Sequence, residues 1–159
     1  SNLGSRGFAI YGANAGDRFG SSITGGEDYN LDGFADFAAG APNASYGSRE
    51  SGAVWVFFGD ATSPGDIDLA SVNPAGTGFA AGDRYGAALG PSGDSEGDGI
   101  PRILVGAPSH YDSANNVEGA GYTTAVRPGD NAAIFPAGTI FGTSDDDDDN
   151  TNDALVGTS

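Results

Sequence analysis

Oxygen-bearing side chains recur at fixed positions in two nine-residue segments, residues 28–36 (the first loop) and 94–102 (the second loop). The first loop has Asp28, Asn30 and Asp32 at positions one, three and five, then a glycine at position six and Asp36 at position nine. Hard cations such as Ca²⁺ take six to eight oxygen ligands and tolerate irregular geometry, and a glycine permits the sharp bend that closes such a loop. One copy would also fit an acidic surface turn, because Asp-Gly pairs are common turn formers. The repetition favours calcium.

The second loop departs from this pattern at its last position. Asp94, Glu96 and Asp98 supply oxygens at positions one, three and five, but Arg102 stands at position nine. A guanidinium cannot ligate a cation and would repel one, and its charge could pair instead with Asp94 or Asp98. We therefore expect weak or no calcium binding by the second loop.

A third, shortened copy of the pattern lies in the acidic run at residues 145–153. Carboxylates fall at positions one, three, five and nine: Asp145, Asp147, Asp149 and Asp153. Asn150 replaces the turn glycine, and Asn is the next most tolerant residue for a left-handed backbone. Such a run is also typical of a disordered acidic tail. The calcium interpretation is slightly favoured here.

Composition limits the function classes. The 159 residues are enough for one domain of ordinary size, and 22 acidic against six basic residues give a formal net charge of -16. Such a surface disfavours nucleic acid and anionic lipid and favours divalent cations. Cysteine is absent, which excludes disulfides and thiol chemistry, and no apolar run is long enough for membrane insertion. The 28 glycines and the short aromatic and β-branched runs predict an all-β fold.

The chain repeats itself at an offset of 66 residues. Residues 16–20 match 82–86, the first loop matches the second, and the Gly-Ala-Pro turn at 40–42 matches that at 106–108. A repeat of this length suits a four-stranded β-propeller blade. Short apolar runs between turn signals predict strands at 7–12, 19–25, 35–40 and 53–58, and again at 78–80, 85–90, 102–106 and 121–126.

The repeat divides the chain into units. We expect a first unit at residues 1–64, a second at 65–130 and a truncated third at 131–159, about two and a half repeats in all. Blades bury their faces only against neighbouring blades. The expected partners are therefore other blades of the same or neighbouring chains, and the chain is expected to be part of a larger object.

These motifs together resemble the FG-GAP repeat of integrin alpha-subunit β-propellers and of many large bacterial surface proteins. Phe19-Gly20 precedes the first Gly-Ala-Pro turn and Tyr85-Gly86 precedes the second, with an acidic loop resembling DxDxDGxxD between them. The resemblance implies four-stranded antiparallel blades, typically seven in a propeller, with calcium loops between the first two strands of certain blades. By position it implies these ligands: Asp28, Asn30, Asp32, Asp36 and the Phe34 carbonyl in the first loop, and Asp145, Asp147, Asp149, Asp153 and the Thr151 carbonyl in the third.

The resemblance also implies a function. We expect a calcium-binding extracellular or cell-surface module for adhesion or scaffolding, with structural calcium, no catalysis and a protein or glycan ligand. Two alternatives stay open: a structural subunit that assembles through open blade edges into a filament or sheath, and an accessory propeller of a larger secreted enzyme.

Three further residues could each have a role of their own. His110 is the only histidine of a chain without cysteine, so partners for zinc or for catalysis are lacking and a surface-loop position is expected. Trp55 lies in an apolar run and is expected in the core. Asn43 begins an Asn-Ala-Ser glycosylation acceptor, which matters only in a secreted eukaryotic protein.

Overall fold

The structure is a computed structural model that describes residues 7–62, 64–128 and 133–134. Its elements are β1 (Ile10–Tyr11), β2 (Ser22–Gly25), β3 (Phe37–Ala41), β4 (Ala53–Phe58), β5 (Ile67–Asp68), the 3₁₀ turn η2 (Leu69–Ser71), β6 (Gly76–Thr77), β7 (Ala88–Gly93), β8 (Arg102–Ala107), β9 (Tyr122–Val126) and β10 (Ala133–Ile134). The predicted all-β class is confirmed. The acidic run at 145–153 lies outside the described residues.

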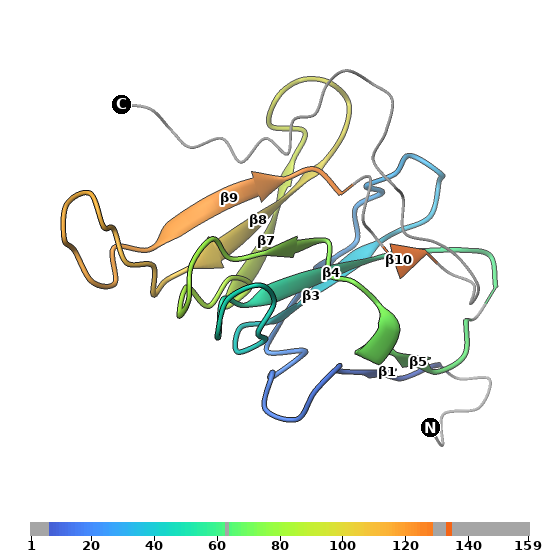
Figure 1. Cartoon of the computed structure of the whole chain (residues 1–159). Helices are drawn as coiled ribbons and strands as arrows, with labels where there is room; N and C mark the ends of the chain where they lie inside the picture. Colours follow the sequence, from blue (N-terminus) through green and yellow to red (C-terminus); the bar gives the residue numbers. More distant parts are fainter. Residues whose placement is uncertain (1–6, 63, 129–132, 135–159) are drawn as a thin grey trace.

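Two mainly antiparallel sheets form the body of the chain, and β1 and β5 form a separate parallel pair (Figure 1). In the first, β2, β3 and β4 form a meander, and the short β6 pairs antiparallel with the start of β4. These four strands have the order of a propeller blade, and β10 adds a fifth strand that runs parallel to the end of β4. The second sheet has the order β7–β8–β9. The chain therefore holds successive β-propeller-type blades.

The strands follow the 66-residue offset. β2 and β7 begin 66 residues apart, β3 and β8 end 66 residues apart, and β1 and β5 have counterparts at that offset in β6 and β10. β4 and β9 begin 69 residues apart, because the connection at 108–121 is longer than the one at 42–52. β6 lies in the second sequence unit but completes the sheet of the first, so the sheets and the sequence units are offset along the chain.

The predicted first strand of each sheet was placed too early. β2 begins at Ser22 because Arg18 and Gly20 before it have φ angles of 60° and 83°. Arg84 and Gly86 have φ angles of 58° and 83° before β7. A left-handed backbone cannot continue an extended strand, so each aromatic-glycine motif forms a turn instead. The strand expected at 78–80 is also displaced, to Gly76–Thr77.

The main core lies between the two sheets. Alternate residues of a strand point to opposite faces, so Val54, Val56 and Phe58 face the second sheet while Trp55 and Phe57 face away from it. The second sheet contributes Ile103 and Val105 to the same core. Trp55 is 1% exposed, as expected from its apolar strand, and packs with residues of the other cluster: Ala39, Ala41, Ala44, Ala53, Phe57 and Leu69.

The glycine of the first Gly-Ala-Pro motif is required by close packing against the segment before β7. Gly40 lies so close to the second sheet that a Cβ added there would be 2.2 Å from the carbonyl oxygen of Gly86. Beside it, Ser22 Oγ donates a hydrogen bond to the same carbonyl at 2.6 Å. The glycine therefore permits the backbone of one blade to touch the next. The acidic loops follow β2 and β7 at one end of the sheets, and the Gly-Ala-Pro motifs end β3 and β8 at the other (Figure 1).

Candidate metal centre

The first loop connects β2 to β3 and is closed at its base by Asp36. The amide of Gly26 donates to the Asp36 carbonyl at 2.9 Å, and the amide of Asp36 donates to the Glu27 carbonyl at 2.7 Å. The Asp36 side chain is 1% exposed, and its two oxygens accept hydrogen bonds from the amides of Tyr29 at 2.7 Å and Gly59 at 2.8 Å. The buried Asp36 carboxylate therefore links the loop to the residue that follows β4.

The other oxygen-bearing side chains of the first loop contact one another or the loop backbone. Asp28 accepts hydrogen bonds from the amides of Asp32 at 3.0 Å and Gly33 at 2.7 Å. Asn30 Nδ2 donates to Asp32 Oδ2 at 2.8 Å, and Asp32 Oδ1 accepts from the amide of Phe34 at 2.8 Å. The structure thus brings Asp28, Asn30 and Asp32 together and leaves Asp36 on the amides at the loop base. Within residues 7–62, 64–128 and 133–134, no three His, Cys, Asp or Glu side chains are grouped closely enough to hold a metal by themselves.

The electrostatics of the first loop show negative charge without a compensating cation. Burial raises the pKa of the Asp36 carboxyl, and the charges of Asp32 and Asp28 raise it further against the hydrogen bonds from Gly59 and Tyr29. In the described part of the chain, no arginine forms an ion pair with these carboxylates. An external cation would relieve this repulsion.

The second loop connects β7 to β8 and has the same backbone scaffold. Asp94 accepts hydrogen bonds from the amides of Gly97 at 2.7 Å, Asp98 at 3.0 Å and Gly99 at 2.9 Å. The amides four and five residues after the first aspartate are engaged in both loops. The two loops are therefore structural equivalents, as the sequence predicted.

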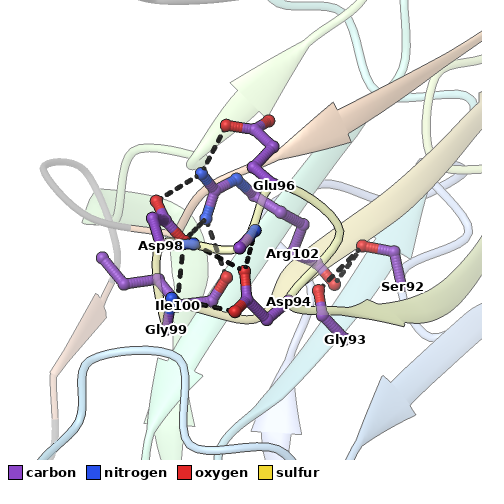
Figure 2. A network of polar contacts seen from close by, with 9 residues as sticks. Ser92, Gly93, Asp94, Glu96, Asp98, Gly99, Ile100 and Arg102 are labelled. Carbon is purple, nitrogen blue, oxygen red and sulfur yellow. Dashed lines mark hydrogen bonds and ion pairs between the residues drawn. The ribbon is translucent and has the colours of Figure 1, made fainter.

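Arg102 lies inside the second loop (Figure 2). It is 4% exposed, and its Nη2 donates to Glu96 Oε2 and Asp98 Oδ2, each at 2.8 Å. Its Nη1 donates to the Ile100 carbonyl at 2.8 Å. The hydrogen bond from Arg102 lowers the pKa of the Asp98 carboxyl to about 2. Of the two predicted partners, Asp98 pairs with the arginine, while Asp94 is occupied by backbone amides.

Glu96 is a partner of Arg102 that sequence reasoning missed. The signal was its place at loop position three, on the same side of the loop as position five. The predicted ligands of the third loop lie outside the described residues: Asp145, Asp147, Asp149, Thr151 and Asp153.

His110 has a partner that the sequence did not indicate. Its Nδ1 lies 2.9 Å from Oδ1 of Asp83, a residue with no exposed surface. The other carboxylate oxygen accepts hydrogen bonds from the Tyr122 hydroxyl at 3.1 Å and from the Ala80 amide at 2.9 Å. The cluster joins the connection before β7, the turn after β8 and the start of β9. No motif could have revealed it, because its members are separated along the chain.

Comparison with known proteins finds a family match for part of the chain. Residues 19–57 match the FG-GAP repeat. The chain is 33% identical over 99 residues to integrin alpha pat-2 of Caenorhabditis elegans, covering 62% of this chain and 8% of that protein. It is 34% identical over 99 residues to integrin alpha-PS5 of Drosophila melanogaster, covering 59% of this chain and 9% of the relative. It is also 39% identical over 85 residues to phosphatidylinositol-glycan-specific phospholipase D of Mus musculus, covering 52% of this chain and 10% of the relative.

The matched segments thus span a tenth or less of these relatives. Among the residues that the structure describes, no helix has the length and apolar character needed to cross a membrane.

Proposed function

Since this chain is an FG-GAP repeat protein similar to integrin alpha subunits, we propose that it is a calcium-binding adhesion module of the cell exterior. Calcium would be structural, held by the side chains of Asp28, Asn30, Asp32 and Asp36 and by the Phe34 carbonyl. Other blades of the same or neighbouring chains are the proposed partners, with a protein or glycan as ligand and no catalytic role for this module.

One observation carries the calcium assignment. In the second loop, the oxygens at positions three, five and seven converge on a single cationic group, the guanidinium of Arg102. The first loop has the same scaffold and oxygen ligands at the same positions, but Asp36 replaces the cation. The first loop therefore has the oxygens of such a cation site but no cationic side chain among them. This supports an external cation as the group that they bind.

The donor chemistry agrees with Ca²⁺. Carboxylate, amide and carbonyl oxygens without nitrogen or sulfur ligands suit a hard cation, and Ca²⁺ accepts the irregular geometry of a nine-residue loop. When bound, the ion would neutralise the repulsion around Asp36 and fix the connection between β2 and β3. Extracellular calcium modules have dissociation constants of about 0.1–1 mM, which is the affinity expected here.

Calorimetric titration with CaCl₂ tests the proposal. Wild type should bind calcium in this range, and Asp32→Ala should abolish binding to the first loop. Glu118→Ala removes one exposed charge from the opposite end of the sheet and serves as the control. Equal calcium binding by wild type and Asp32→Ala would reject the first loop as the site.

The similarity to a phospholipase D favours a second candidate, an accessory propeller of a larger secreted enzyme. A catalytic domain elsewhere in the full-length protein would support it. Hydrolysis of a glycosylphosphatidylinositol substrate by this segment alone would contradict the proposed absence of catalysis.

The sheet edges favour a third candidate, assembly into a filament or sheath. Within the described ranges, β9 pairs only with β8, and an unpaired strand edge can recruit another strand. Light scattering after size-exclusion chromatography should show concentration-dependent assemblies if this candidate holds, whereas a monomer at all concentrations would exclude it.

A further inference from the structure

We infer that Arg102 is a built-in cation that takes the place of a metal ion in the second loop. Its guanidinium contacts Glu96 at loop position three, Asp98 at position five and the Ile100 carbonyl at position seven. These are three of the positions from which the first loop would supply metal ligands. Figure 2 shows the guanidinium among these oxygens.

The arrangement leaves little room for a competing metal. Arg102 is 4% exposed, so a metal that displaced it would leave a buried charge without partners, which is unfavourable. The planar guanidinium group can donate hydrogen bonds to several fixed oxygens at once, which the ammonium group of a lysine does less well. The second loop is therefore closed with or without divalent cations.

Because only the second loop contains a cationic side chain, the two blades should respond differently to calcium. Arg102 is the first residue of β8, and Ile103 and Val105 after it lie in the core between the sheets. The internal cation therefore keeps β8 in place when calcium is removed. Calcium depletion should loosen the first loop and leave the second blade folded. The assignment of Arg102 goes beyond the proposed calcium site and does not depend on it.

The inference also predicts a latent metal site. Arg102→Asp places a carboxylate at position nine, as Asp36 does in the first loop, and removes the internal cation. The second loop of this variant should depend on an external cation. Arg102→Gln removes the charge and supplies no carboxylate, so its second loop should stay open in any buffer.

Hydrogen exchange of the intact chain, read by mass spectrometry in CaCl₂ and in EDTA, tests the inference. In wild type, amides at 94–100 should exchange equally slowly in both buffers. In Arg102→Gln they should exchange about tenfold faster or more in both, because hydrogen bonds to charged groups are lost. In Arg102→Asp they should exchange fast in EDTA and slowly in CaCl₂, with one additional calcium bound in calorimetry.

Two outcomes would overturn the inference: faster exchange of the wild-type second loop in EDTA, or an Arg102→Asp variant without calcium dependence. Arg102→Lys keeps the positive charge but loses the planar guanidinium group. Its second loop should exchange at a rate between those of wild type and Arg102→Gln, which keeps the test valid if Arg102→Gln fails to fold. Fluorescence of the buried Trp55 reports folding of the first blade independently. If the first loop alone ignores calcium, the proposed function fails and the assignment of Arg102 stands.

Discussion

Nδ1 of His110 lies 2.9 Å from Oδ1 of Asp83, which joins the turn after β8 to the connection before β7. Tyr122, the first residue of β9, donates its hydroxyl to the same carboxylate at 3.1 Å. Burial, with the nearby charge of Asp83, raises the pKa of Tyr122, so its hydroxyl stays protonated and can donate. One buried carboxylate thus fastens three segments of the second blade.

Asp83→Ala should lower the free energy of unfolding by about 2–4 kcal/mol, because it strips hydrogen-bond partners from a buried network. Asp17→Ala is the matched control, since Asp17 is the equivalent residue 66 positions earlier and its side chain accepts from Asn14 at 3.1 Å. That change should cost about 1 kcal/mol. Urea unfolding measures both, and equal losses would mean that the His110 and Tyr122 contacts add no stability.

Gly40→Ala should destabilise the chain by about 3 kcal/mol, because the new Cβ would meet the Gly86 carbonyl at 2.2 Å. Gly106 is the equivalent glycine, and a Cβ there would meet its nearest neighbour, Ala88 Cβ, at 3.5 Å. Gly106→Ala should therefore change stability by less than about 1 kcal/mol. Thermal unfolding of the pair separates close contact between blades from a general intolerance of alanine in these strands. Similar losses in both variants would contradict the packing argument.

Calcium should raise the melting temperature of wild type by about 5–10 °C at a hundred times its dissociation constant, which corresponds to about 2.7 kcal/mol per site. Asp32→Ala should remove this increment and change the melting temperature in EDTA much less. Differential scanning calorimetry in both buffers, with Glu118→Ala as the charge control, checks the prediction. An equal loss in calcium and in EDTA would show that Asp32 acts through the protein alone.

Much of this fold was predictable because its signals are local and repeated. Apolar runs marked β3, β4, β8 and β9, and the recurrence of the acidic loops and Gly-Ala-Pro turns gave the 66-residue offset. The strands at 19–25 and 85–90 were predicted to start too early, because an arginine with positive φ is not visible in the sequence as a strand breaker. The calcium ligands of the first loop stay predictions.

Contacts between side chains far apart in the sequence were harder to predict. The Asp83–His110 contact depends on how the connection before β7 meets the turn after β8, and nothing in the spacing of these residues encodes it. The sequence identified Arg102 as a misfit to a metal loop and Asp98 as one of two possible partners. The choice of Asp98 over Asp94 follows from the backbone amides that occupy Asp94, which only the folded loop reveals.

The ion pair of the second loop should respond to acid in a defined window. The hydrogen bond from Arg102 lowers the pKa of Asp98 from 3.8 to about 2, so its contribution to stability is present above about pH 4 and is lost as the pH falls toward 2. In Arg102→Gln the pKa should return toward 3.8, although the amide of Ile100 still donates to Asp98 at 2.9 Å and keeps it somewhat lower. Carboxyl ¹³C shifts measured across a pH titration report this directly. Asp112 is the internal control, since its pKa is lowered chiefly by Asn115 and should not move in the variant. An Asp98 carboxyl that titrates identically in both proteins would show that the arginine does not hold its charge.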